Sequence, residues 1–244
     1  HRYQRVKTSV LGKSQARKKV GKNLLDPIKR QKISVKHGID IWNIYDFMYL
    51  DNRMMPQLKI LEVVIPYESD LIIESKSLKL YLNEFYKKSF KNKNKLITKI
   101  KKDLEASIKS KIKIKFINKF LSEPKYLDLN KTNLINTREN TVLKFNGFRS
   151  ICPVTSQPDF ASIYIYTDKK INVKYLNKYL ISFRDHGGFH EQCIDEIYLH
   201  IVKKFNPEHI EICGRFQRRG GIDINPFRGN KKVKLFGNFR EFNQ

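Results

Sequence analysis

Cys152 is the residue whose chemistry first needs an explanation. It lies in the segment Ser150 to Phe160 (SICPVTSQPDF), where two prolines follow it and Asp159 comes seven residues after the thiol. The prolines and the polar stretch between them predict an irregular turn, not a helix or a central strand. Such a turn can fold the acid back beside the thiol, which is the minimum apparatus for covalent catalysis. A lone cysteine can equally be a small buried apolar residue, so this segment alone leaves both interpretations open.

Two further segments are dense in groups that bind ligands or transfer protons. The first, Ile73 to Tyr81 (IESKSLKLY), contains Glu74 beside an apolar run. The second, Ser182 to Cys193 (SFRDHGGFHEQC), places His190 directly before Glu191. Taken singly, each glutamate could be a solvated helix residue and the histidine a structural one. Their occurrence together with the cysteine segment favours a catalytic interpretation.

Length and composition limit the possible classes of protein. The 244 residues, 40% of them hydrophobic, are enough for one large domain or two modules with separate cores. No run of eighteen apolar residues predicts a membrane helix, and the polar, basic start 1–23 lacks the apolar segment of a secretory signal. Three cysteines without a C-x-x-C pair argue against a disulfide framework and a zinc site, so we expect a reducing cytoplasm.

The net charge of +25 has two interpretations. Lysine and arginine release counterions from phosphates, so the charge favours nucleic-acid binding. The basic residues are mostly lysine, however, and they are spread over the N-terminus, 85–119 and 231–240. Together with abundant isoleucine and asparagine they also suit coding drift in an AT-rich genome. Charge alone reports non-specific attraction, so we expect no specific nucleic-acid partner.

The first half of the chain predicts strands followed by helices. Segments 39–49 and 57–66 are rich in β-branched and aromatic residues, and the turn 51–53 between them predicts an antiparallel hairpin. Apolar residues at helical spacing over 78–104 predict two helices separated by the polar stretch 91–95. The remaining expected segments are an irregular basic lead-in (1–37), a strand (112–120) and a polar connector (123–139).

The second half repeats this plan. Clean alternation predicts a strand over 162–166, and helical spacing predicts helices over 173–183 and 190–205. The expected elements that follow are a strand (209–216), a turn (218–221) and a final short edge strand (222–227). Strands, two helices and strands again indicate an α+β fold.

An internal repeat supports two copies of one module. The four apolar positions Leu78, Tyr81, Leu82 and Phe85 recur at a constant offset as Leu176, Tyr179, Leu180 and Phe183. We therefore predict a lead-in (1–37), a first module (38–122), a connector (123–140) and a second module (141–244).

At this point the chain resembles a known family. Glu74 to Tyr81 (ESKSLKLY) is similar to the signature E-[SL]-K-S-x-K-L-[YFW] of the NADPH-dependent nitrile reductases of queuosine biosynthesis, the 7-cyano-7-deazaguanine reductases. Three other blocks resemble that family in the same order: CPVTSQPD from Cys152, SFR through HE from Ser182, and RRGG through NP from Arg218. The glutamate motif precedes the cysteine motif, which resembles the two-module type of this family.

The resemblance implies a fold and an activity. It implies tandem tunnelling-fold (T-fold) modules, each an antiparallel sheet backed by two helices, and a homodimer. It implies reduction of the nitrile of 7-cyano-7-deazaguanine to 7-aminomethyl-7-deazaguanine, with NADPH as cofactor and a cysteine thioimide as intermediate. No metal is implied. NADPH would bind without a Rossmann motif, because no G-x-G-x-x-G follows a strand.

The resemblance also implies roles for particular residues. The expected catalytic residues are Cys152, Asp159 and His190. The expected substrate-binding residues are Ile73, Glu74, Ser75, His190 and Glu191. The expected cofactor-binding residues are Ser75, Lys76, Arg219 and Gly220. Asp159 would shuttle protons, and we expect burial to raise its pKa for that role. The carboxylates would accept hydrogen bonds from the N–H groups of the base, and the cations and glycine would contact phosphates.

Two other functions stay open on the sequence alone. The first is a basic nucleic-acid-binding module, which the charge and the interleaved aromatic residues suggest. The second is a cyclohydrolase-like T-fold enzyme, which would act on a related ring. That enzyme normally needs zinc, and no set of histidines and cysteines has convincing ligand spacing here.

Overall fold

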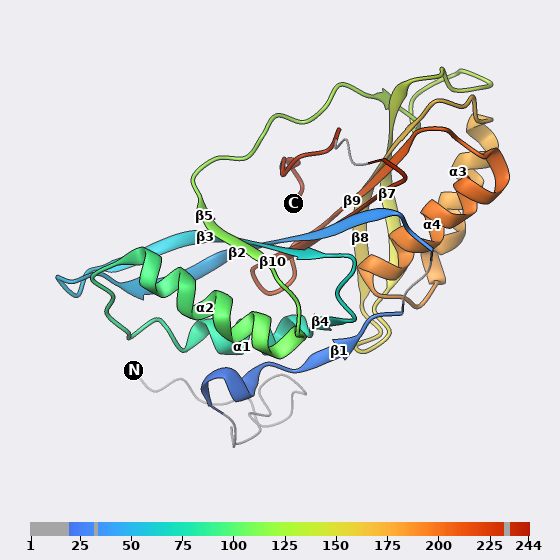
Figure 1. The fold of residues 1–244 in the computed structure, drawn as a ribbon. Helices are drawn as coiled ribbons and strands as arrows, with labels where there is room; N and C mark the ends of the chain where they lie inside the picture. The colour runs from blue at the N-terminus through green and yellow to red at the C-terminus, as the bar shows by residue number, and fades with distance from the viewer. Residues whose placement is uncertain (1–19, 32–33, 232–234) are drawn as a thin grey trace, which may run out of the picture.

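A single eight-stranded sheet forms the centre of the computed structural model, which describes residues 20–31, 34–231 and 235–244 (Figure 1). Its strands lie in the order β5-β3-β2-β10-β9-β8-β7-β6, and neighbours are antiparallel except β6 and β7. The bounds are β2 His37–Leu50, β3 Pro56–Pro66, β5 Lys113–Ile117, β6 Leu127–Asp128, β7 Thr141–Ile151, β8 Pro158–Thr167, β9 Ile210–Phe216 and β10 Ile222–Gly229. A separate pair consists of β1 Pro27–Lys29 and β4 Leu71–Ile73.

Two pairs of helices lie toward the two ends of this sheet (Figure 1). The bounds are α1 Ser75–Asn83, α2 Lys93–Ile108, α3 Val173–Ile181 and α4 His190–Phe205, with 3-10 helices η1 Gly21–Leu24 and η2 Ser182–Asp185. Both pairs cover the same face of the sheet, because Asp40, Trp42 and Ile44 occupy every second position of β2 and so share one face. Trp42 and Ile44 pack in the core beneath α1 and α2, while Asp40 pairs with Arg228, which in turn bonds Asp195 of α4.

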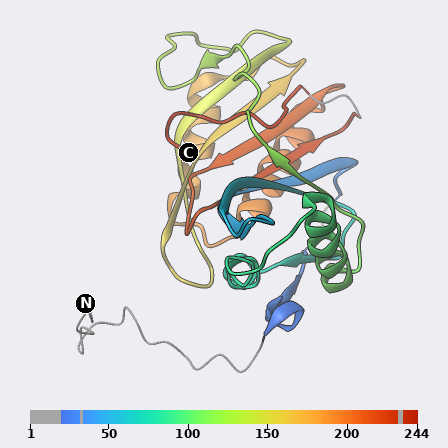
Figure 2. The ribbon, with the colours of Figure 1, turned by 90° about the vertical axis from the view of Figure 1, so that its left-hand side faces the viewer.

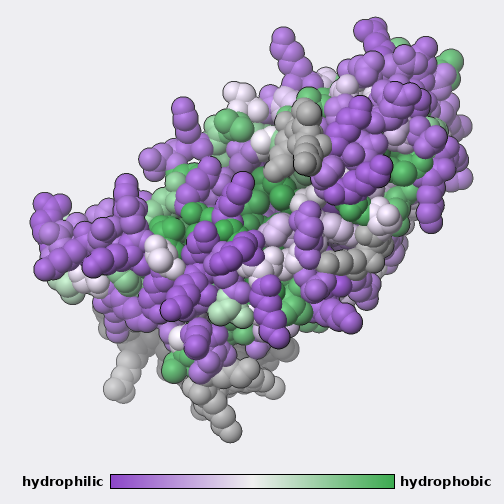
Figure 3. Space-filling model, in the orientation of Figure 1, coloured by the Kyte–Doolittle hydropathy of each residue, from purple (hydrophilic) through white to green (hydrophobic). Residues whose placement is uncertain are grey.

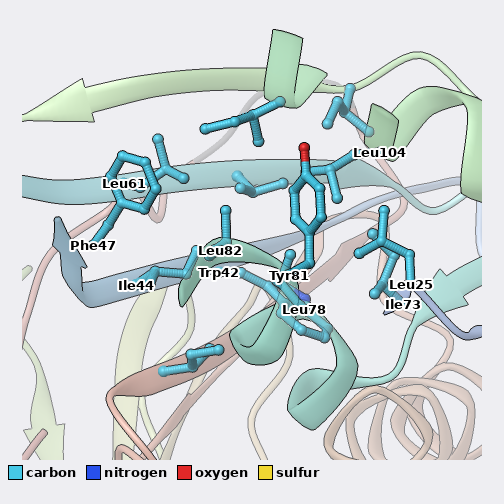
Figure 4. Packing of buried hydrophobic residues seen from close by; sticks show 14 of the residues in the cluster. Leu25, Trp42, Ile44, Phe47, Leu61, Ile73, Leu78, Tyr81, Leu82 and Leu104 are labelled. Carbon is cyan, nitrogen blue, oxygen red and sulfur yellow. The ribbon is translucent and has the colours of Figure 1, made fainter. Parts of the chain in front are cut away.

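Amphipathic spacing explains how the first helix pair packs. Leu96, Ile100 and Leu104 recur at helical spacing in α2 and are fully buried against the sheet. Figure 4 shows Tyr81 and Leu78 of α1 packed beside Trp42 in the same cluster. The outer face of α2 is rich in exposed lysine, and the surface seen in Figure 3 is largely hydrophilic. The second pair packs on a separate cluster that includes Leu176, Leu180 and Phe183.

The opposite face of the sheet is covered by the C-terminal segment 235–244 (Figure 2). Phe236 and Phe239 of this segment pack against Tyr164, Cys213 and Phe227 of the central strands. The helix face is therefore the face on which a cavity between the two helix pairs can form.

Most of the predicted elements are confirmed, and the α+β class with them. The helix over 190–205 has the predicted bounds, and the hairpin, two helices in the 78–104 region and the strands over 162–166 and 209–216 are present. The second helix, α2, begins at Lys93, inside the predicted separator 91–95. Of the predicted lead-in, residues 1–19 lie outside the described residues, while 20–31 contain η1 and β1 instead of irregular chain.

The expected edge position of the last strand is wrong. The sequence predicts a final short edge strand over 222–227, yet β10 lies between β2 and β9 in the middle of the sheet. The proline is tolerated because β9 pairs with β10 only from Phe227 onward. The predicted irregular turn is confirmed, because β7 ends at Ile151, β8 starts at Pro158, and residues 152–157 belong to neither strand.

The division into two modules stays a prediction. Two hydrophobic clusters lie under the two helix pairs, as two modules would require. Ile222 of β10, however, packs in the first cluster, so the last strand of the chain contributes to the core of the first half. Among the described residues, no helix is both long and apolar enough to span a membrane.

Candidate active site

A cavity of about 620 Å³ lies between the two helix pairs, on the helix face of the sheet. Trp42 of β2 and its cross-strand partner Ile224 of β10 line it, together with Ile222. The ten site residues predicted from the sequence all line this cavity: Ile73, Glu74, Ser75, Lys76, Cys152, Asp159, His190, Glu191, Arg219 and Gly220. The structure therefore brings together four segments that are far apart in the chain.

Cys152 follows the last residue of β7 and is half-buried. Its N–H donates to the carbonyl of Gln157 at 2.9 Å, and its own carbonyl accepts from Ser156 N–H at 2.9 Å, so the loop closes on itself. Burial favours the neutral thiol, but hydrogen bonds from the hydroxyl and N–H of Thr155 and the N–H of Val154 outweigh it and lower the pKa of Cys152. The loop thus presents a thiol that ionises more readily than usual.

Asp159 is almost fully buried at the start of β8. One carboxylate oxygen accepts from Arg219 Nη1 at 2.6 Å, and the other lies 3.3 Å from His190 Nε2. Burial pushes the pKa of Asp159 upward, but the hydrogen bonds and charges of His190 and Arg219 outweigh burial and lower it. The expectation of a raised pKa is therefore wrong, because Arg219 and His190, supplied by distant segments, stabilise the carboxylate.

His190 and Glu191 occupy the first turn of α4. The ring of His190 stacks on Phe216, with centroids 4.0 Å apart and planes 13° apart. Among the described residues, the buried atoms His190 Nδ1 and Glu191 Oε1 have no hydrogen-bond partner. Burial, and then the charge of Asp40, raise the pKa of Glu191, while His190 and Arg30 lower it. A buried carboxylate oxygen without a donor suits a ligand that brings N–H groups.

Glu74 has a local role as well as a place in the cavity. It is the N-cap of α1, and its carboxylate accepts from the N–H groups of Lys76 at 2.8 Å and Ser77 at 2.6 Å. Its own N–H donates to Asp26 at 2.9 Å, so the residues before β1 fix the start of α1. Ile73, the preceding residue, ends β4 and is fully buried.

The predicted cofactor residues gather at the start of α1 and in the loop before β10. Gly220 has φ +59°, a conformation that favours glycine, and its carbonyl accepts a hydrogen bond from Lys79 Nζ. Ser75, Lys76 and Lys79 add a hydroxyl and two cations, and this donor set fits the phosphate groups of a nucleotide cofactor. Arg219 is different, because its guanidinium already bonds Asp159, Thr155 and Gln157.

Sequence reasoning missed several residues that line the cavity. Lys79 belongs to the same basic motif as Lys76 and could have been found there. Trp42 is the one tryptophan of the chain and lies on the apolar face of a predicted strand, but that pattern indicates a core residue. Ile28 comes from the predicted lead-in, and no signal in the sequence places it here. Within the described part of the chain, no group of three or more His, Cys, Asp or Glu residues could hold a metal ion.

This arrangement defines a class of protein before any comparison. An α+β chain that places an activated thiol, an ion-paired carboxylate and an unpaired carboxylate around one cavity has the equipment of an enzyme that works through a cysteine nucleophile.

Comparisons with known proteins agree on one family. Residues 7–116 match the family described as nitrile reductase, 7-cyano-7-deazaguanine-reductase N-term, and residues 158–234 match the family described as QueF-like protein. Three relatives named NADPH-dependent 7-cyano-7-deazaguanine reductase are similar over most of their length. The Buchnera aphidicola protein is 36% identical (88% of this chain, 94% of the relative), that of Paraburkholderia phymatum 34% (91% and 93%), and that of Coxiella burnetii strain Dugway 35% (85% and 82%). The chain belongs to the family of NADPH-dependent 7-cyano-7-deazaguanine reductases, as its motifs predicted.

Proposed function

We propose that this protein reduces the nitrile of 7-cyano-7-deazaguanine to the aminomethyl group of 7-aminomethyl-7-deazaguanine with NADPH, as a step of queuosine biosynthesis. The names of its relatives support this substrate and this cofactor. The observation that carries the proposal is the shared cavity of Cys152, Asp159 and Glu191, which combines a nucleophile, a proton carrier and an acceptor for ring N–H groups.

The first step is covalent and balanced within the site. The sulfur of Cys152 bonds to the nitrile carbon, one π bond of the nitrile breaks, and the thiol proton passes to the nitrile nitrogen through Asp159. The product is a thioimide, which accepts hydride more readily than a nitrile does. The lowered pKa of Cys152 supplies thiolate, and the lowered pKa of Asp159 keeps a carboxylate ready to take the thiol proton.

The remaining steps need protons and a leaving thiolate. When bound, NADPH supplies the two hydrides that the former nitrile carbon takes up. Asp159 and His190 deliver the proton that the nitrogen takes up with the first hydride, and the C–S bond then breaks with the electron pair going to Cys152. The hydrogen bonds that stabilise the thiolate therefore assist its departure as well as its attack. One further proton restores the thiol, so two hydrides and two protons convert the nitrile into the amine.

Substrate binding follows from the unpaired groups of the cavity. Glu191 offers a buried oxygen to the N–H groups of the base. Glu74 faces the same cavity, but its carboxylate oxygens already accept hydrogen bonds from the start of α1. A substrate N–H group would therefore bond to oxygens that also cap the helix. Trp42, Phe189 and Ile224 provide apolar surface for the faces of a flat ring.

The finer features implied by the family are also proposals. Two helix pairs on one largely antiparallel sheet support tandem T-fold modules. A homodimer and a cytoplasmic location fit an enzyme of this family.

A direct assay tests the proposed function. The protein is mixed with 7-cyano-7-deazaguanine and NADPH, and absorbance at the nicotinamide band is followed. We expect consumption that disappears in Cys152→Ala and persists in Cys213→Ala, which alters a buried cysteine on the opposite face of the sheet. Incubation with the nitrile alone should change the ultraviolet spectrum of the wild type but not that of Cys152→Ala. No consumption by the wild type, with tight salt-sensitive RNA binding instead, would refute the proposal in favour of a nucleic-acid-binding module.

A further inference from the structure

A buried network of charged side chains lies behind Glu191, away from the thiol. Asp40 of β2 accepts from Arg228 Nη1 at 2.8 Å and pairs with Arg30 Nη2 at 2.5 Å. Arg228 also bonds Asp195, which lies one turn after Glu191 on α4. The four side chains of this network are almost fully buried. Two arginines and two aspartates balance each other, so the charge of Glu191 is additional to the network.

Both arginines of the network have a buried nitrogen without a hydrogen-bond partner among the described residues, Arg30 Nη1 and Arg228 Nη2, and Arg30 is the one whose charge acts on Glu191. Its Nε donates to the carbonyl of Ser69 at 3.1 Å and its Nη2 to Asp40, but its buried Nη1 has no hydrogen-bond partner among the described residues. Glu191 Oε1 is likewise buried without a partner, and the charges of the two residues interact. Each of these two buried residues thus has a polar atom without a hydrogen-bond partner among the described residues, and their opposite charges attract.

The segment that carries Arg30 is also part of the cavity wall. Ile28 of β1 lines the cavity, and β1 pairs with β4 directly before Glu74. Gln31 accepts from Gln192 Nε2 at 3.0 Å, which fixes the same segment to the first turn of α4. Residues 27–31 therefore connect the starts of α1 and α4, the two helices whose first turns hold the cavity's glutamates.

We propose that Arg30 is a positioning residue that keeps Glu191 ionised and oriented, so that its carboxylate can accept hydrogen bonds from the N–H edge of the substrate base. This inference rests on the proposed function. Arg228 is shared by Asp40 and Asp195, so Arg30 supplies the second positive charge of the network. Arg30 keeps one N–H group without a partner among the described residues, and its charge also acts on the additional buried acid, Glu191.

Charged groups on α4, on β2 and directly after β1 act on the carboxylate of Glu191. On α4 they are His190, which favours the carboxylate, and Asp195, which is paired with Arg228. Asp40 on β2 disfavours it, and Arg30 favours it. Across the cavity lie Cys152, Asp159 and Glu74, of which Asp159 is neutralised by Arg219. Removing Arg30 would leave burial and Asp40 opposed by His190 and a backbone hydrogen bond, so Glu191 would hold its proton to higher pH.

The test measures binding of 7-cyano-7-deazaguanine and its KM as a function of pH in Arg30→Met. Glu191 must be ionised to accept N–H groups, so binding weakens as pH falls through its pKa. We expect this acid limb to move upward by about one pH unit, and binding on that limb to weaken about tenfold, with kcat at saturation changed less than KM. Arg30→Lys should restore most of the wild-type profile because it keeps the charge.

Lys29→Met is the matched control, since it removes one positive charge at the exposed position directly before Arg30. Its profile should match the wild type. Should Arg30→Met not fold, Arg30→Gln carries the same prediction, because glutamine keeps donors for Asp40 and Ser69 without the charge. A folded Arg30→Met or Arg30→Gln with the wild-type profile would overturn the inference, and so would an Arg30→Lys variant as impaired as either. Failure of the proposed function is distinct, because the wild type itself would then neither bind nor reduce the nitrile.

Discussion

Arg219→Met separates two roles that the sequence and the geometry give to one residue. The family resemblance predicts a phosphate contact for Arg219, whereas its guanidinium lies 2.6 Å from Asp159 and interacts with the sulfur of Cys152. A charge-assisted hydrogen bond contributes about 1.5 to 3 kcal/mol. Because the arginine side chain is 35% exposed, solvent screening favours the lower end, about 1.5 kcal/mol or about a tenfold effect. Methionine keeps the length of the side chain and removes the charge.

Adduct formation in the absence of NADPH distinguishes the two roles of Arg219, because it depends on Cys152 and not on cofactor binding. Loss of the cation raises the pKa of Cys152, so less thiolate is present near neutral pH, and we expect the nitrile adduct to form about tenfold more slowly by stopped-flow ultraviolet absorbance. Arg218→Met is the control, because this exposed neighbour stacks on Tyr45 instead of reaching Asp159. Wild-type adduct formation in Arg219→Met, combined with a raised KM for NADPH, would refute the reasoning and leave a purely cofactor-binding arginine.

Three further predictions concern stability and loop geometry. Asp159 has a lowered pKa in the folded protein, so its contribution to folding stability is present above its ordinary pKa and is lost as pH falls through the lowered pKa. The melting temperature of the wild type should therefore fall more steeply on acidification than that of Asp159→Asn. Leu104→Ala empties a fully buried site and should cost about 2 to 5 kcal/mol in denaturant titrations, whereas Lys102→Ala on the exposed face of α2 should change little; equal effects would contradict the packing. Gly221 has φ +82°, and an added Cβ would lie 2.5 Å from Asp46 Oδ2, so Gly221→Ala should displace the loop and raise the KM for NADPH, measured by steady-state kinetics against the wild type.

Local patterns predicted the helices better than the strand order. The helix over 190–205 follows directly from its apolar spacing and has the predicted bounds. The strand β7 escaped prediction because a bulge between Phe145 and Phe148, with Gly147 at φ +75°, interrupts its alternation. The central place of β10 escaped because Pro226 suggests an edge, and only the extent of pairing with β9 shows why the proline is tolerated.

The site residues that belong to the four motif segments were predictable from the sequence. Motif order and residue type selected the residues that line the cavity, although their roles stay proposals. The direction of the pKa shift of Asp159 was not predictable, because it depends on His190 and Arg219, which reach it only through the fold. Arg30 was not predictable for the same reason, since a lone arginine in a basic lead-in carries no sign of its buried partners.

The central position of β10 explains how the two helix pairs come to share one cavity. Ile224 pairs with Trp42 and completes the cavity wall on the side of α1, while Arg228, four residues later on the same face, bonds Asp195 of α4. The loop that enters the strand carries Arg219 to the carboxylate beside the thiol. A strand at the edge of the sheet could meet one helix pair but not both. The register of β10 against β2 and β9 therefore fixes the distance between the nucleophile side and the carboxylate side of the cavity, and the rigidity of a central strand keeps that distance constant.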